Sequence, residues 1–163
     1  MHKRVTLLIA GMGLLATTVG CAAMRAASAK HRHIRSQAEQ FVYQKSITEV
    51  WPQARQMLFE KGLQVRDTGE AGTLTLETDW LSDNAGGSSR YLVQGIKVDE
   101  ATCKVQFTKA TKRSAPNGQT STSSDRDVDA EWDLIKRVAP EKAVEIESEA
   151  ELKGEAARAE SQS

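Results

Sequence analysis

Histidine is scarce in this 163-residue chain, and the part that reads as a folded core has none. The three histidines are His2, His31 and His33. Nucleophilic catalysis of the Ser-His or Cys-His type therefore has no base in the core. His31 and His33 alone make a poor metal site, because a bound zinc ion takes three or four protein ligands. The sequence predicts no catalytic residue, no cofactor and no metal site.

An excess of charge of either sign is also missing, and cysteine is rare. The 22 basic side chains balance 22 acidic ones, which gives no global attraction to nucleic acid. The two cysteines are Cys21 and Cys103, which could form a disulfide or serve separate purposes. Cys103 alternates with Val105 and Phe107 on one face of a predicted strand, which favours a buried, inert thiol.

The chain begins with the pattern of a signal segment, MHKRVTLLIAGMGLLATTVGCAAM. A short basic start precedes an apolar run of roughly fifteen residues, which suits a signal-peptide core and is short for a spanning helix of about 20 residues. The stretch TTVGC, Thr17 to Cys21, resembles the lipobox of bacterial lipoproteins, with small residues directly before a cysteine. The alternatives are an uncut signal anchor, or cleavage elsewhere with an incidental Cys21.

The lipobox resemblance implies that residues 1–20 are removed and that the Cys21 thiol receives a diacylglycerol. Two or three acyl chains exceed the one-chain threshold for stable anchoring in a membrane. By resemblance to lipoprotein sorting signals, Ala22 in place of aspartate after the cysteine implies the outer membrane, with the protein facing the periplasm. About 143 residues then remain, enough for one domain.

Residues 21–40 are interpreted as the lipidated cysteine and a basic tether. The segment contains one acidic residue, Glu39, and four basic ones: Arg25, Lys30, Arg32 and Arg35. Basic side chains beside a lipid anchor favour anionic headgroups, by roughly 1 kcal/mol each near a charged surface. A plain solvated linker explains the same composition.

A helix is predicted directly after the tether. Ser46 to Glu49 has the capping-box pattern, and apolar residues then recur at helical spacing up to Leu58. Gly62 is a suitable stop, because glycine favours the position after a helix. Pro52 predicts either a loose first turn or a helix that starts properly near Trp51.

Strands are predicted on both sides of that helix, at 41–43, 63–66, 73–81, 90–98 and 102–109. Within 90–98 the apolar residues change from odd to even positions, from Tyr91 and Val93 to Ile96 and Val98. This change predicts a bulge at Gly95, which lies between them. The segment 114–126 is interpreted as a flexible polar loop, and a second helix follows, with Val128, Trp132, Ile135 and Ala139 on one stripe. Pro140 restarts or kinks this helix, and 139–163 is interpreted as an acidic, Glu/Ala-rich helical tail.

This order of elements predicts an α+β domain over 41–138, with an antiparallel sheet of four to five strands, one helix across it and a C-terminal helix. Three runs carry a family resemblance: WPQARQMLFEKGLQVRD at 51–67, GTLTLETDW at 72–80 and SRYLV at 89–93. They resemble the repeated domain of BamC-type (NlpB) lipoproteins. The resemblance implies a helix-grip fold and a non-enzymatic role among envelope proteins that insert β-barrels into the outer membrane. The alternative is a small apolar ligand held between helix and sheet.

The remaining polar motifs are weak. Asp125, Asp127 and Asp129 resemble the start of a calcium loop but lack its later glycine and glutamate, so acidic residues at a helix start explain them better. Glu77 and Asp79 could form a catalytic pair, although Thr75 beside them indicates a solvated strand face. Trp80 and Arg90 flank a predicted hairpin loop and form the candidate interaction edge. Its alternative is a core aromatic beside a surface charge.

Overall fold

The computed structural model describes residues 15–69, 73–82, 87–114 and 118–161, with the backbone alone for 15–21. The chain divides into two compact units. One comprises residues 35–143 and contains the predicted domain 41–138. The other combines residues up to 34 with residues from 144 onward. Each unit is described by itself.

The unit of residues 35–143 has the predicted α+β fold with an antiparallel sheet, although the sheet has six strands rather than the predicted four to five. The strand order is β1-β2-β4-β5-β6, and β3 pairs with β4 beside β2. The strands are β1 (Val65–Asp67), β2 (Leu74–Thr78), β3 (Leu81–Ser82), β4 (Gly87–Lys97), β5 (Cys103–Ser114) and β6 (Thr120–Arg126).

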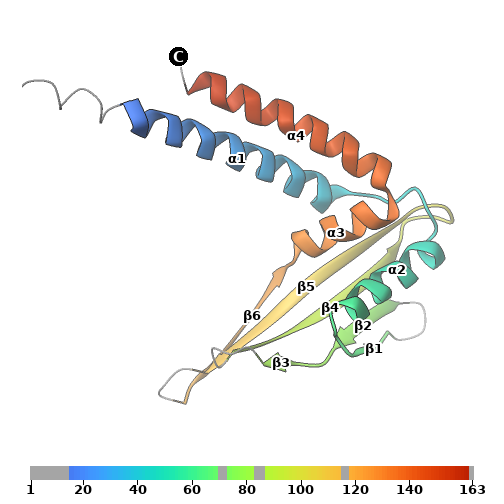
Figure 1. Cartoon of the computed structure of the whole chain (residues 1–163). Coiled ribbons are helices and arrows are strands. Elements are labelled where there is room, and N and C mark those ends of the chain that lie inside the picture. Colours follow the sequence, from blue (N-terminus) through green and yellow to red (C-terminus); the bar gives the residue numbers. More distant parts are fainter. Residues whose placement is uncertain (1–14, 70–72, 83–86, 115–117, 162–163) are drawn as a thin grey trace, which may run out of the picture. The chain divides into compact units, whose positions relative to one another are not determined.

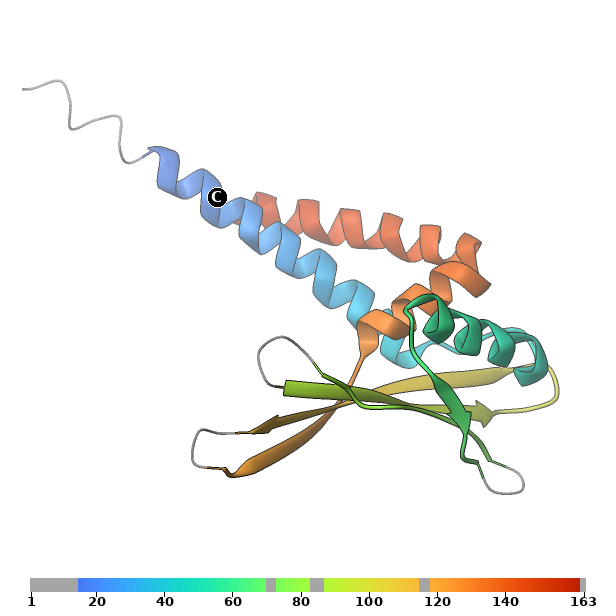
Figure 2. The same cartoon turned by 60° about the horizontal axis from the view of Figure 1, so that its bottom comes forward.

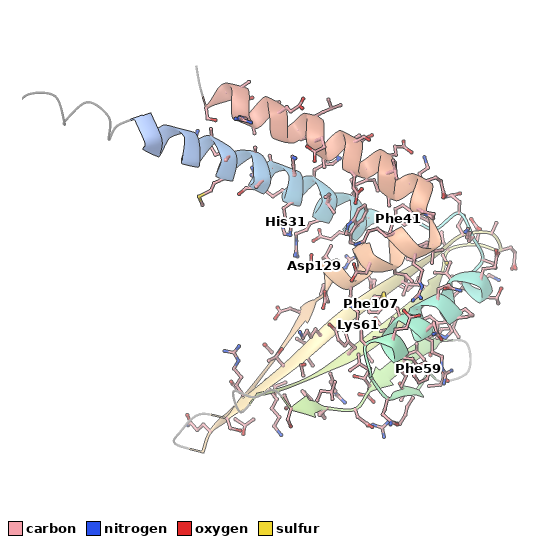
Figure 3. The ribbon with its side chains drawn as sticks, viewed as in Figure 1. His31, Phe41, Phe59, Lys61, Phe107 and Asp129 are labelled. Carbon is pink, nitrogen blue, oxygen red and sulfur yellow. The ribbon has the colours of Figure 1, made fainter. Side chains whose placement is uncertain are left out.

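Two helices cover one face of this sheet, α2 (Ile47–Glu60) and α3 (Val128–Val138) (Figure 1 and Figure 2). Figure 3 marks Phe107 on β5, where the helices meet the sheet. The side chains between the helices and the sheet are closely packed and fully buried: Val50, Ala54, Leu58, Leu76, Val93, Phe107, Leu134 and Ile135. This apolar layer is the core of the unit.

The predicted ends of α2 are confirmed. The Glu49 carboxylate accepts hydrogen bonds from the Ser46 backbone N–H at 3.2 Å and from its hydroxyl at 2.7 Å. At the other end Gly62 has a φ of 75°, and Gly62 and Leu63 donate to carbonyl groups of the last turn. Of the two alternatives that Pro52 left open, the start near Trp51 is wrong, because α2 begins at Ile47 and runs through Pro52.

Gly95 does not form a bulge. The register between β4 and β5 is unbroken from Gly87 opposite Arg113 to Lys97 opposite Cys103. Glycine serves another purpose there, because a Cβ atom would lie 3.0 Å from the Trp51 ring. The absence of a side chain lets the α2 tryptophan lie directly on the sheet.

The irregularity of the sheet lies instead between β2 and β3. Glu77 pairs with Leu92 and Leu81 pairs with Ser89, so the β2–β3 side holds one residue more than the matching stretch of β4. This is a β-bulge, and its extra residue lies among Asp79 and Trp80, opposite Arg90. A bulge turns the local side chains away from their regular directions.

The segment 114–126 is not a flexible loop throughout. β5 continues to Ser114, and β6 returns along it in continuous antiparallel register. Residues 115–117 lie outside the described part. All seven side chains of β6 are exposed, so both faces of the strand are polar and the sequence shows no alternation.

The predicted first strand, 41–43, is reduced to a single bridge between Tyr43 and Cys103. Tyr43 donates to the Cys103 carbonyl at 2.9 Å, and Cys103 donates back at 3.2 Å. Tyr43 is buried, so this bridge fixes the chain before α2 against the edge of β5.

The other unit is a pair of antiparallel helices, made from α1 (Leu15–Gln40) up to residue 34 and from α4 (Pro140–Glu160) from residue 144. The predicted tether is therefore helical, and the predicted restart at Pro140 and helical tail are confirmed. Lys30 pairs with Glu151, and His33 lies 3.1 Å from Glu149. Among the helices that the structure describes, none is both long enough and apolar enough to span a membrane.

Replacing Gly95 by alanine should lower the free energy of unfolding by about 1–3 kcal/mol, because the added methyl group overpacks the contact with the Trp51 ring. Urea denaturation of the full chain measures the change. The neighbouring exposed residue provides a control, since Gln94→Ala should stay within about 0.5 kcal/mol. Equal stability of Gly95→Ala and the unchanged protein would show that the ring has room to move.

Candidate functional site

The predicted lipid-attachment residue, Cys21, lies in the helical backbone of α1, and its side chain is outside the described residues. Attachment of lipid to Cys21 therefore stays a prediction. Cys103 is a free thiol that is fully buried on β5. Burial, reinforced by the charge of Glu49, raises the pKa of this thiol to about 11. Cys103 is thus protonated at neutral pH, as an inert core residue should be.

Trp80 and Arg90, the predicted interaction edge, lie together at the bulge. The Arg90 guanidinium carbon lies 4.9 Å from the centre of the Trp80 ring, which is a cation–π contact. Arg90 also pairs with the Glu77 carboxylate on β2. The sheet register explains the arrangement, because the extra residue brings Trp80 opposite Arg90.

Trp80 is an exposed aromatic and does not belong to the core. Trp80 is 39% exposed, and the next residue, Leu81, is 48% exposed. Arg90, which is itself held by Glu77, restricts the ring before any partner arrives, so less side-chain entropy is lost on binding. Tryptophan and arginine in such a position are the residue types that carry most binding energy in protein interfaces.

The backbone beneath Trp80 is held by a side chain. Thr78 is buried at the end of β2, and its hydroxyl accepts the Tyr91 N–H of β4 at 2.9 Å. This hydroxyl takes the place of the carbonyl group that a regular strand would present. The bulge is therefore a defined conformation with its backbone donor satisfied.

An ion pair between a buried glutamate and a largely exposed arginine, which the sequence did not predict, joins α3 to the sheet. Glu131 is only 2% exposed, and its carboxylate accepts two hydrogen bonds from Arg126 of β6, at 2.9 and 2.8 Å. The same carboxylate accepts the Phe107 backbone N–H at 3.1 Å. Arg126 also donates to the Glu39 carbonyl at 2.7 Å, and the hydrogen bonds to Glu131 raise the pKa of the guanidinium.

A sequence signal for Glu131 exists in the helical stripe of α3. Glu131 lies three residues after Val128 and four before Ile135, so it occupies the apolar face of the helix. An acidic residue in that place needs a buried partner. The basic residue just before the helix, Arg126, supplies it.

The acidic run at 125–129 begins a helix, as predicted. The Asp127 carboxylate accepts the Ala130 N–H at 3.0 Å and so caps α3. Its second oxygen accepts the Tyr91 hydroxyl at 2.9 Å, and burial together with this hydrogen bond raises the pKa of Tyr91. In the described ranges no three His, Cys, Asp or Glu residues gather in a way that would hold a metal ion.

The two acids considered as a catalytic pair serve separate ion pairs. Glu77 pairs with Arg90, whereas Asp79 accepts from Arg66 at 2.6 Å. Each carboxylate is neutralised by its own arginine, which agrees with the solvated strand face indicated by Thr75.

The chain matches no protein-family model, no curated protein and no solved structure. The fold and the geometry of these residues are therefore the basis on which its function is inferred.

Replacing Arg126 by alanine should lower the free energy of unfolding by about 3 kcal/mol, because the buried Glu131 carboxylate then loses its partner. Glu131→Gln should cost less, since the amide oxygen can still accept the Phe107 N–H. Thermal and urea unfolding of the full chain measure both changes. Arg113→Ala is the matched control on the exposed end of β5, with an expected effect within about 0.5 kcal/mol. Equal effects of Arg126→Ala and Arg113→Ala would contradict the structural role of the ion pair.

Proposed function

We propose that this protein is a lipoprotein anchored in the outer membrane through Cys21, whose non-enzymatic α+β domain binds another protein in the periplasm. The observation that carries the binding role is the exposed Trp80 ring held by Arg90 at the bulge. This arrangement supplies an aromatic anchor and an arginine that are positioned in advance.

The lipid anchor rests on the sequence of the first 24 residues. The apolar run ends in TTVGC, where small residues precede a cysteine whose thiol can accept a lipid. Ala22, the residue after it, favours the outer over the inner membrane by resemblance to lipoprotein sorting signals. The buried, inert Cys103 supports separate roles for the two thiols.

A role in assembly of the outer membrane is the most specific form of the proposal. It rests on the resemblance of 51–67, 72–80 and 89–93 to the BamC-type domain. In this chain these runs form α2, β1, β2 and the part of β4 beside Trp80. The partner would then be an envelope protein, and the membrane is engaged through the lipid.

Storage of an apolar ligand between helix and sheet receives no support from the core. That function needs an apolar cavity of several hundred cubic ångströms. The side chains that would line it, such as Leu58, Leu76 and Phe107, are fully buried in close packing. We therefore retain protein binding as the proposed function.

Replacing Cys21 by serine should abolish lipid labelling and release the protein from the outer membrane. Labelling of cells with a palmitate analogue, followed by membrane fractionation, measures both effects. Globomycin should block cleavage of the unchanged protein after residue 20. Cys103→Ser is the matched control and should label normally. Labelling of the Cys21→Ser form would contradict the anchor.

A photocrosslinking residue in place of Leu81 should trap a periplasmic or outer-membrane protein in cells. Adding Trp80→Ala should reduce the adduct at least about thirtyfold, which corresponds to a hot spot of 2 kcal/mol. The same crosslinker at Lys104, at the other end of the sheet, is the control and should give no such adduct. Persistence of the adduct without Trp80 would contradict the proposed binding surface.

A further inference from the structure

The far end of the sheet projects beyond the two helices. Figure 1 and Figure 2 show β5 and β6 continuing past α3 as a narrow ribbon, with the start of β4 beside them. We call residues 110–114 and 120–124 the ribbon tip. Its β6 part is exposed on both faces, so it adds nothing to the core.

The outer edge of β6 is a free edge of the sheet. β6 is the last strand in the order, and in the described part of the chain it pairs only with β5. The pairing also shows which groups point outward. The Asp127 N–H donates to the Phe107 carbonyl at 2.8 Å, so the backbone groups of residue 127 point toward β5. Because hydrogen-bonded residues alternate along an antiparallel pair, the backbone groups of residues 125, 123 and 121 point toward β5 as well. The backbone groups of Thr120, Thr122 and Ser124 therefore point away from β5.

This edge lacks the usual protection against pairing. Natural edge strands are blunted by lysine, proline, bulges or short length. β6 is seven residues long, in regular register, and residues 120–124 read T-S-T-S-S. Small hydroxyl side chains leave the backbone open to an incoming strand.

The charge of the ribbon tip selects the kind of strand. The tip contains Lys112 and Arg113 and no acidic residue, and the nearest acid on β6, Asp125, lies opposite Lys109. Lys112 and Arg113 lie opposite Thr122 and Ser121 of β6. They project to opposite faces of the ribbon, one strand away from the free edge. A groove of about 390 Å³ lies here, lined by Thr111, Arg113, Ser121, Thr122, Ser123 and Asp125.

We infer that the outer edge of β6 binds an extended, acidic segment of another protein by β-strand addition. The backbone groups at 120, 122 and 124 would supply the main-chain hydrogen bonds, and Lys112 and Arg113 would favour acidic side chains on the added strand. This surface is distinct from Trp80, and the inference does not depend on the lipid anchor.

The test uses two synthetic peptides and the full chain carrying Cys21→Ser, kept in a neutral detergent because the apolar run at 5–19 remains. One peptide alternates threonine with glutamate, and its matched control alternates threonine with lysine. The glutamate peptide should bind at least tenfold more tightly. Lys112→Glu combined with Arg113→Glu should remove that preference, whereas Lys104→Glu, at the other end of β5, should keep it.

Hydrogen exchange locates the binding. The glutamate peptide should protect the amides of Thr122 and Ser124, whereas those of Ser121 and Ser123 should already be protected. Thr122→Pro should abolish binding without loss of the β5–β6 pairing, because this N–H points outward. Thr122→Ala should bind normally.

Four results would overturn the inference. They are no binding of the glutamate peptide, equal binding of both peptides, unchanged exchange at Thr122 and Ser124, and protection of these amides that depends on protein concentration without peptide. The last would mean that a second copy of the chain occupies the edge. Because these measurements use no membrane and leave Trp80 intact, they can fail while the proposed function stands, and the reverse also holds.

Discussion

The structure of residues 35–143 depends on the place where β6 ends and α3 begins. At Asp127 the chain leaves the sheet. The backbone N–H of Phe107 on β5 would therefore have no backbone carbonyl of β6 to donate to. The Glu131 carboxylate accepts the Phe107 N–H instead, and Arg126 neutralises the buried charge. An unsatisfied backbone donor or an unpaired buried charge would each cost several kcal/mol. One ion pair therefore lets the chain change from strand to helix while both remain attached to the core.

The same solution appears, with a neutral side chain, at the end of β2. There the Thr78 hydroxyl accepts the Tyr91 N–H before the chain enters the bulge. In both places a side-chain oxygen replaces a main-chain oxygen as the hydrogen-bond acceptor. The regular strand can therefore end there, and no backbone N–H is left without a partner. Tyr91 connects the two, because its hydroxyl donates to Asp127 at the start of α3. The Trp80 surface is thus supported by the same hydrogen-bonded framework as the helix layer.

The sequence predicted those features whose causes are local. The caps of α2 follow from Glu49 and Gly62, and the stripe of α3 follows from residue spacing. The role of Gly95 could not be predicted, because it depends on Trp51, which is distant in sequence and lies on another element. β6 was missed because a strand exposed on both faces has no alternation to detect. Glu131 could have been recognised as an acid within an apolar stripe, and the Trp80–Arg90 contact was anticipated only as two residues flanking a loop.

The two surfaces proposed for binding differ in a way that follows from these constraints. Trp80 lies in the body of the sheet, next to a bulge whose backbone N–H donor has a hydrogen-bond partner, so its ring is restrained. Apolar contact is the natural source of affinity there. The ribbon tip has no core to restrain it, and the side chains of its β6 part are small, so main-chain hydrogen bonds and the charge of Lys112 and Arg113 are what it can offer. An apolar anchor tolerates salt, whereas a charged strand edge loses affinity as salt rises. A partner that used both surfaces would gain from linked binding, since a strand held at the edge raises the local concentration of its neighbour at Trp80.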